Sequence, residues 1–260
     1  MFKKVFILIF ITINLLGNTK KSYYDVDYNI DIPVILSSVL IGVLPGFLTP
    51  NLPSYMKSES LDIDDVNSFD KLTLYSYSPV SAKISDYIVA SMAVMPFAVN
   101  WIDNSSSDYV KESLIIFETI AISSALNNIV KYSVSRPRPY IYSDKASEKE
   151  KSNRDANLSF YSGHSTFAFS AAVSFATIMS KRFDKTWQKS LIWGIPLSLA
   201  STVAFLRVNA GKHFLSDVLT GAVIGSSIGW LVPYLHEKSG NQIIAGGSQQ
   251  GIIIGYSGSF

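Results

Sequence analysis

The chain alternates long apolar segments with short polar clusters. Six apolar segments follow an apolar N-terminus, at residues 32–48, 87–101, 114–130, 166–179, 191–206 and 218–235. Their length and their lack of strict apolar and polar alternation favour helices over strands. The pattern predicts an all-α protein, a bundle of six helices.

The length of these segments leaves two arrangements open. Each segment is at or below the roughly 20 residues that a bilayer core requires, and one carries Glu118, Asn127 and Asn128. A membrane bundle and a soluble bundle both fit. If the segments span, the basic stretch Lys181 to Lys189 is predicted to be cytoplasmic, with the loops after Val130 and Leu206 on the outer side. In that arrangement the first segment, residues 32–48, is not expected to span.

The two ends of the chain differ from the segments between them. Residues 1–17 combine Lys3 and Lys4 with an apolar run and then Gly17, which predicts a signal peptide, or else an uncleaved anchor. The tail, residues 239–260, is rich in Gly and Ser and ends in an alternating apolar pattern, which predicts a β-strand or hairpin. Residues 30–236 are predicted to form one domain between these ends.

Composition narrows the classes of function. The chain is 48% hydrophobic and 16% charged, with a net charge of +2 and no cysteine. The charged fraction is well below that of ordinary soluble domains. The basic residues are scattered among acidic ones, so nucleic acid is not expected as a partner. The absence of cysteine excludes disulfides, thiolate metal sites and thiol catalysis.

The first polar cluster follows the third apolar segment. Lys131 and Arg138 are seven residues apart, and Pro137 and Pro139 force the chain out of the helix there. An Arg fork and a Lys point charge suit a phosphate site. Taken alone, the cluster also fits a solvated basic helix end.

The second cluster precedes the fourth segment and contains Ser162, Gly163 and His164. Backbone N–H groups at a helix start bind anions, and glycine allows the backbone to approach closely. Taken alone, this cluster also fits a serine N-cap beside a surface histidine.

The third cluster contains Arg207, His213 and Asp217. On a helix, residues four apart share a face, so Asp217 is placed to hold one imidazole nitrogen of His213 while the other faces a substrate. A surface ion pair is the simpler alternative. Two of the chain's three histidines lie in these clusters, and His236 is interpreted as incidental.

The three clusters together carry a resemblance. Their order, K-x6-R-P, then S-G-H, then R-x5-H-x3-D, resembles the three-part signature of the type 2 phosphatidic acid phosphatase (PAP2) superfamily, which includes bacterial acid phosphatases, lipid phosphatases and vanadium haloperoxidases. The resemblance covers roughly residues 85–236. Tyr161 stands where the family usually has Pro, and Leu206 where it usually has Ser. Neither residue is a reacting group, so these two differences are expected to alter the activity rather than to abolish it.

The resemblance implies a role for each matching residue. His213 is expected to attack phosphorus and form a phosphohistidine, with Asp217 fixing its tautomer and His164 protonating the leaving oxygen. The equatorial phosphate oxygens are expected to contact Lys131, Arg138, Ser162, Gly163 and Arg207. No metal and no cofactor is expected, because three cations supply the charge stabilisation that phosphoryl transfer requires.

The expected substrate is a phosphomonoester or diphosphate, favouring a lipid such as phosphatidic acid, a polyprenyl diphosphate or a lipid A phosphate. A soluble periplasmic acid phosphatase acting on small phosphate esters is the alternative. A vanadate-dependent haloperoxidase and a non-catalytic binding protein for lipid headgroups are further alternatives. The expected location is a bacterial cell envelope, in the inner membrane with the active site facing the periplasm.

Overall fold

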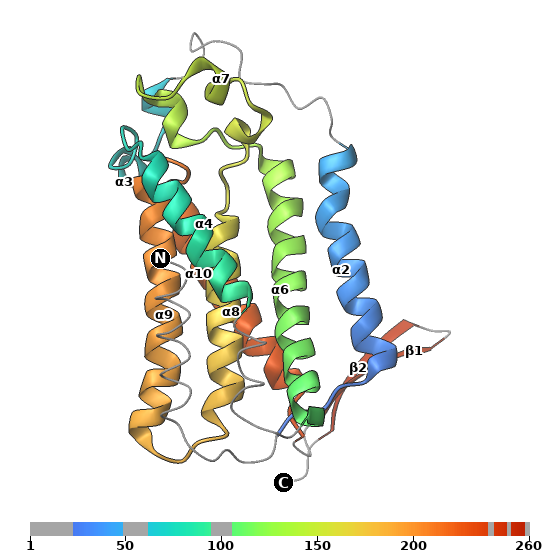
Figure 1. Cartoon of the computed structure of the whole chain (residues 1–260). Coiled ribbons are helices and arrows are strands. Elements are labelled where there is room, and N and C mark those ends of the chain that lie inside the picture. Colours follow the sequence, from blue (N-terminus) through green and yellow to red (C-terminus); the bar gives the residue numbers. More distant parts are fainter. Residues whose placement is uncertain (1–22, 49–61, 95–105, 239–241, 249–250, 258–260) are drawn as a thin grey trace.

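The computed structural model describes residues 23–48, 62–94, 106–238, 242–248 and 251–257. The proposed signal peptide, residues 1–17, lies outside them. Six helices of 15 residues or more are present in the described part: α2 (Tyr28–Leu48), α4 (Pro79–Ala93), α6 (Ser106–Val134), α8 (Gly163–Ser180), α9 (Thr186–Asn209) and α10 (Leu215–Leu235). The all-α bundle predicted from the sequence is therefore confirmed (Figure 1).

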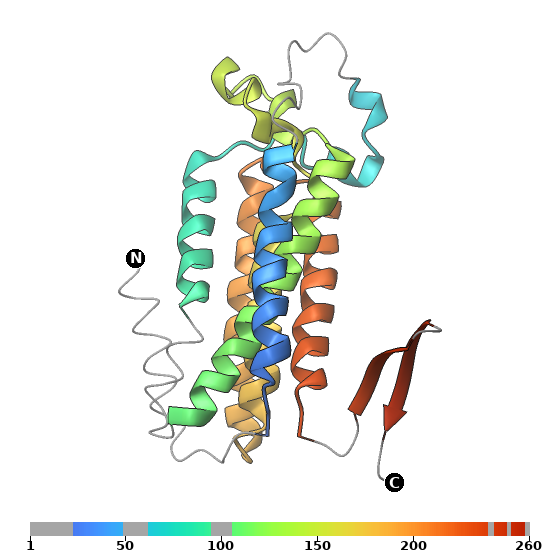
Figure 2. The same ribbon diagram turned by 90° about the vertical axis from the view of Figure 1, so that its right-hand side faces the viewer.

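Shorter elements connect the long helices at one end of the bundle. They are η2 (Ile63–Asp65), α3 (Ser68–Lys71), η4 (Pro139–Tyr142), α7 (Glu148–Lys151) and η5 (Arg154–Asn157). At the opposite end lie β1 (Gln242–Ser248) and β2 (Gly251–Ser257), an antiparallel pair that agrees with the predicted hairpin. Figure 2 shows this pair beside the lower end of the bundle. These two ends are called the loop end and the hairpin end below.

Local sequence explains where the helices begin and end. Ser78 caps α4 by accepting a hydrogen bond from the Ser81 N–H, and Pro79 occupies the first turn, where its missing N–H costs nothing. α6 stops at Val134, three residues before Pro137, so Arg138 lies beyond the helix rather than on its face. Ser162 caps α8 through the Ser165 N–H.

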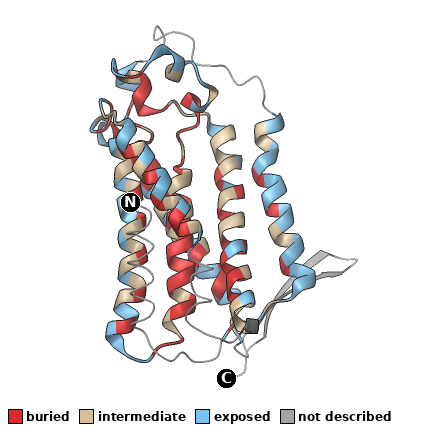
Figure 3. Cartoon of the chain, viewed as in Figure 1, coloured by how far each residue is buried: buried red, intermediate tan, exposed pale blue. Residues whose placement is uncertain are grey.

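α8 is the central helix of the bundle. Its Phe175, Ile178 and Met179 pack with α6, α9 and α10 in one buried cluster, and its Ala168 and Ala172 pack with α4 and α9 in a second. Figure 3 shows α8 largely buried, whereas α2 is exposed along most of its length. The helices α4, α6, α9 and α10 therefore surround α8, whereas α2 packs on the outside of α6.

Glycine at every fourth position of α10 allows this helix to lie against α8. A Cβ atom added at Gly221, Gly225 or Gly229 would lie 2.7, 2.4 or 2.9 Å from a backbone carbonyl oxygen of Ser162, Thr166 or Ser170. Only hydrogen fits in these places, as in the small-residue interfaces of membrane helices. This close contact fixes the start of α10 next to the start of α8.

Four described helical segments are long and apolar enough to cross a membrane. They are Tyr28–Leu48, Asp108–Tyr142, Thr186–Asn209 and Leu215–Leu235. Large apolar side chains on their surfaces are exposed, among them Leu36, Phe47, Phe205 and Val223. Such surfaces suit contact with lipid. The first segment is 21 residues long and contains a window of 18 residues with a mean hydropathy of 2.0, so its length and composition allow it to span, against the expectation that it does not.

The basic stretch at the hairpin end exposes less positive charge than its sequence indicates. Arg182 is buried and pairs with the buried Glu112 of α6 at 2.9 Å. Lys181 forms an ion pair with Glu237. The remaining cations, Lys185 and Lys189, are exposed. The stretch does lie at the end opposite the loops that follow α6 and α9, as expected (Figure 1).

Candidate active site

The three polar clusters predicted to carry the chemistry lie together at the loop end. α6 and α9 run toward this end, whereas α8 and α10 begin there (Figure 1). The Ser162 N–H donates to the Asp217 carbonyl at 3.0 Å, which joins the start of α8 to the first turn of α10. Helix direction and the glycine contact thus gather residues that are far apart in sequence.

His213 is the most deeply buried member of the cluster, with 0% of its surface exposed. Its Nδ1 donates to the Ser159 carbonyl at 2.8 Å, and its Nε2 lies 3.4 Å from Nη1 of Arg138. Burial, followed by the charges of Arg138, Lys131 and Arg207, lowers the pKa of His213 well below its usual value. The ring is therefore neutral near pH 7, with the Nε2 lone pair directed at the cations.

Asp217 takes a different position from the one expected. Its Oδ2 is 3.7 Å from Nδ1 of His213, too far for a hydrogen bond. Oδ2 instead accepts hydrogen bonds from the Ser159 hydroxyl at 2.5 Å and from the Phe214 N–H at 2.9 Å. The reason is local, because Asp217 is the third residue of α10 and caps its first turn. The Ser159 carbonyl, rather than Asp217, fixes the tautomer of His213.

Arg136, which lies outside the sequence signature, holds Asp217 in place. Its guanidinium reaches Oδ1 of Asp217 at 2.7 Å and Oδ2 of the fully buried Asp70 at 2.8 Å. Burial alone would raise the pKa of Asp70, but its bonds to Arg136, Ser216 and Asn67 outweigh that effect and lower it. Arg136 thus links the short helix α3 to α10.

Gly163 and Lys131 lie side by side where α8 begins. A Cβ at Gly163 would come within 2.8 Å of Asn127 Oδ1 and 3.5 Å of Lys131 Nζ. Asn127 donates to the Tyr161 carbonyl at 2.7 Å and so fixes the turn that precedes α8. The Ser162 hydroxyl is fully buried and serves as the helix cap. Glycine is therefore the residue that lets an anion approach both the start of α8 and the lysine.

Lys131 is the cation of the cluster whose donors are uncommitted. Among the described residues, no hydrogen bond or ion pair of Lys131 is found, whereas Arg138 and Arg207 each contact a carboxylate. Its ammonium group lies near Gly163 and near enough to His213 to lower the pKa of that imidazole. Three N–H donors are thus free to bind an anion there.

Arg138 joins two loops beside His213. It donates to the Asp155 carboxylate at 2.7 Å and to the backbone carbonyls of Asp155 and Lys212 at 2.7 and 2.9 Å. Burial alone would raise the pKa of Asp155, but Arg138 and Lys131 outweigh it and lower that pKa. The guanidinium is 3% exposed, so its geometry is fixed before any ligand binds.

His164 lies at the solvent side of the cluster, with 32% of its side chain exposed. Its Nε2 is 2.8 Å from Oδ1 of Asp86, and the same oxygen accepts a hydrogen bond from Arg207 at 3.1 Å. Burial and the charge of Arg207 lower the pKa of His164, while Asp86 acts in the opposite direction. Asp86 therefore connects the second and third clusters.

The structure brings together all eight predicted site residues and adds others that the sequence reasoning did not select. The additional residues are Asp70, Asp86, Asn127, Arg136, Asp155 and Ser159. Asp86 carried a detectable signal, because an acidic residue beside an apolar helical segment is uncommon. Ser159 carried none, since it acts through a backbone carbonyl.

Comparison with known proteins identifies the family. Residues 112–241, half of the chain, match the PAP2 superfamily. The chain belongs to the PAP2 superfamily. All three parts of the signature lie within the matched residues. Membership of this family, together with relatives named phospholipid phosphatases, indicates a phosphatase.

Individual relatives are distant. A PA-phosphatase related-family protein of Dictyostelium discoideum is 28% identical, covering 77% of this chain and 76% of its own. Phospholipid phosphatase 1 of Rattus norvegicus is 31% identical, covering 42% of this chain and 46% of its own. The chain thus spans about half the length of that relative. The crystal structure of Aquifex aeolicus LpxE is similar with a TM-score of 0.44 at 21% identity, covering 66% of this chain and 98% of its own.

Proposed function

We propose that this protein is a membrane-bound, metal-independent phosphatase that hydrolyses a phosphomonoester or diphosphate of a lipid through a phosphohistidine at His213. The observation that carries the proposal is the setting of His213. Its Nδ1–H is held by the Ser159 carbonyl at 2.8 Å, and its Nε2 faces Arg138, close to Lys131 and Arg207. A neutral nucleophile surrounded by cations suits attack on a phosphate ester.

The first chemical step transfers the phosphoryl group to the enzyme. The lone pair of His213 Nε2 forms a bond to phosphorus while the bond from phosphorus to the ester oxygen breaks. His164 donates a proton to the leaving oxygen. The imidazole becomes cationic as it is phosphorylated, and it is stabilised by the Ser159 carbonyl and by the Asp217 carboxylate 3.7 Å away.

The second step releases phosphate. His164, now neutral, removes a proton from a water molecule, whose oxygen attacks phosphorus while the phosphorus–nitrogen bond breaks. This returns His213 and His164 to their starting states. Lys131, Arg138, Arg207 and the start of α8 at Ser162 and Gly163 stabilise the negative charge on the equatorial oxygens in both steps.

The protonation of His164 depends on the substrate. In the free protein, burial and Arg207 lower its pKa, which disfavours the protonated acid. A bound phosphate offsets the charges of Arg207 and Lys131, so its arrival raises the pKa of His164. His164 is thus protonated once the substrate is bound. Asp86, whose Oδ1 is 2.8 Å from Nε2 of His164, also favours the protonated form.

A lipid substrate is supported by the surface of the bundle. Four segments are long and apolar enough to cross a membrane, and the exposed apolar side chains on α2, α9 and α10 suit lipid contact. The site lies at the loop end, opposite the basic stretch Lys181–Lys189. By the positive-inside rule we expect the site on the outer face of a bacterial inner membrane, toward the periplasm, after export directed by residues 1–17.

The deciding experiment separates the membrane enzyme from its alternatives. The full chain is expressed, membranes and soluble fractions are separated, and phosphate release is measured with EDTA on phosphatidic acid and on a soluble monoester. EDTA-resistant release from the lipid by the membrane fraction supports the proposal. Soluble activity on both substrates would indicate a broad-specificity acid phosphatase. No release from either would contradict an enzyme and leave a lipid-binding protein.

A further inference from the structure

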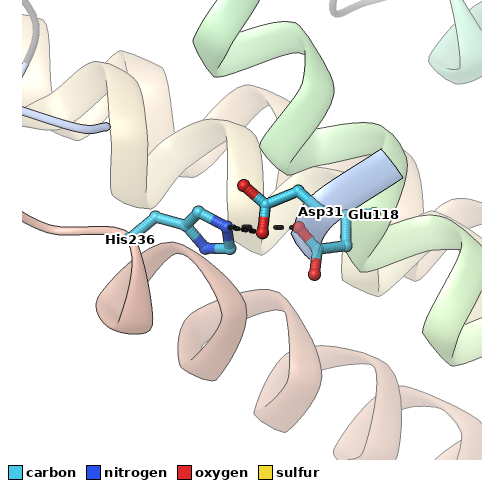
Figure 4. A group of neighbouring side chains, drawn as sticks. All are labelled: Asp31, Glu118 and His236. Atoms are coloured by element: carbon cyan, nitrogen blue, oxygen red, sulfur yellow. Dashed lines mark ion pairs between the residues drawn. The ribbon is translucent and has the colours of Figure 1, made fainter. Parts of the chain in front are cut away.

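A second group of ionisable side chains lies away from the active site, near the hairpin end. Asp31 in the first turn of α2, Glu118 of α6 and His236 immediately after α10 point toward one another (Figure 4). His236 Nε2 is 3.3 Å from Oδ1 of Asp31 and 3.2 Å from Oε2 of Glu118. The interpretation of His236 as incidental is therefore wrong, because folding supplies two carboxylates from distant parts of the chain.

Two carboxylate oxygens of this group are buried without a hydrogen-bond partner in the described residues. They are Oδ2 of Asp31 and Oε2 of Glu118, the latter making only its ion-pair contact with His236. Both residues are 6% exposed. A buried carboxylate oxygen with no donor loses the hydrogen bonds that it would make in water. A cation held by Oε2 of Glu118 and by both oxygens of the Asp31 carboxylate would satisfy these two atoms.

The orientation of His236 suits coordination of a metal ion. Its Nδ1 donates to the Val232 carbonyl at 2.8 Å, which directs Nε2 at the two carboxylates. Metal-bound histidines are commonly held in this way through their second nitrogen. The three ligand atoms lie within 4.8 Å of one another. Separations of 3.2 to 3.3 Å match neighbouring ligands of an ion with bonds of about 2.0–2.1 Å.

The balance of charge favours a group that holds a divalent ion over the three side chains without one. Two carboxylates and an imidazolium leave one net negative charge in a buried place, whereas two carboxylates, a neutral imidazole and a divalent cation sum to zero. The nearby Glu237 does not alter this balance, because it pairs with Lys181. Uncompensated buried charge is strongly unfavourable.

We propose that Asp31, Glu118 and His236 bind a divalent transition-metal ion that joins α2, α6 and α10. One nitrogen and two carboxylate oxygens suit Zn²⁺ or Mn²⁺ rather than Ca²⁺, which takes oxygen ligands. Glu118 and Lys131 are thirteen residues apart on α6, or about 20 Å along the helix axis. The ion therefore takes no part in phosphoryl transfer, and the proposal stands independently of the proposed function.

The test measures metal directly on the full chain. The protein is purified in detergent without chelators, and its zinc and manganese content is determined by mass spectrometry. The EDTA-stripped protein is then titrated with ZnCl₂ while its thermal unfolding midpoint is followed. We expect about one ion per chain and a rise of several degrees in the midpoint on saturation. Absence of bound metal, with a midpoint that does not respond to Zn²⁺ or Mn²⁺, would overturn the proposal in favour of a simple ion-pair cluster.

Variants locate the ion. Asp31→Asn and Glu118→Gln preserve shape while removing a ligand charge, and each is expected to weaken Zn²⁺ binding at least tenfold. Glu237→Gln, next to His236 but outside the group, is the matched control and retains the ion. His213→Ala also retains it, which excludes the active site as the binding place. Unchanged binding in both ligand variants would refute the assignment. If a variant fails to fold, the absorption spectrum of Co²⁺ bound to the wild-type chain still reports the ligand set.

Discussion

The two ends of the bundle each place a histidine beside carboxylates, yet their electrostatic settings are opposite. At the loop end, burial and the cations Arg138, Lys131 and Arg207 lower the pKa of His213. At the hairpin end, burial alone would lower the pKa of His236, but Glu118, the Val232 carbonyl and Asp31 outweigh it and raise it to about 9. The same side chain is thus a neutral nucleophile in one place and, when no metal ion is bound, a cationic partner of two carboxylates in the other.

The difference shows that a nearby carboxylate does not by itself define a catalytic histidine. Asp217 lies four residues after His213 but does not hydrogen-bond to it. Asp31 and Glu118 are remote in sequence from His236 but lie within 3.3 Å of it. The sign of the surrounding charge, which depends on contacts between helices, decides what each ring can do. The predictions that follow test this contrast, beginning with the largest expected effect.

Replacing each histidine in turn tests the contrast most strongly. We expect His213→Ala to reduce phosphate release by at least about 10³-fold, because it removes the proposed nucleophile. His236→Ala is expected to retain turnover to within a few-fold once corrected for folded protein. Both are measured on detergent-purified protein whose helical content is checked by circular dichroism. Equal losses in the two variants would contradict the separation of roles.

Arg136→Ala tests whether the position of the Asp217 carboxylate depends on the Arg136 guanidinium. Removing the guanidinium leaves the fully buried Asp70 without its counter-ion, and we expect a loss of about 3 kcal/mol in stability. Turnover is expected to fall as well, because Asp217 holds Ser159, which orients His213. Denaturant unfolding and phosphate release measure the two effects. Arg136→Lys, which cannot bridge both carboxylates, should restore only part of either.

Gly225→Ala tests the helix contact that connects the two ends. A methyl group at this position would lie 2.4 Å from the Thr166 carbonyl, so α10 has to move away from α8. We expect a loss of about 1–3 kcal/mol in stability, measured by thermal or denaturant unfolding. The matched control is Gly194→Ala on α9, where a Cβ meets nothing within 4 Å. If Gly225→Ala were as stable as this control, the close contact would not matter.

Asp86→Asn is expected to shift the pH dependence of turnover. Asp86 raises the pKa of His164, so its removal lowers that pKa, and the general acid loses its proton at a lower pH. The alkaline limb of the kcat profile should therefore move to lower pH by about one unit. The acidic side, which reflects His213, should stay unchanged. A profile that keeps its shape but falls uniformly would indicate a purely structural role for Asp86.

Much of the architecture follows from local sequence. The length of the apolar segments and their lack of strict alternation predicted six helices. Ser78, Ser162 and the prolines after Val134 mark helix ends, because caps and proline act through the backbone nearby. The ordered triple of motifs gave the family, since spacing and residue type are properties of the sequence itself. The glycines at every fourth position of α10 were also visible, although what they contact was not.

Only the tertiary structure decided which groups meet. The Ser159 carbonyl beside His213, the Asp86 carboxylate between His164 and Arg207, and the group formed by Asp31, Glu118 and His236 each join residues from different helices or loops. Sequence determines which side chains a helix carries, but the electrostatic environment of a side chain depends on which helices pack against it. For that reason the reacting residues were predictable, whereas the partners that set their charge were not.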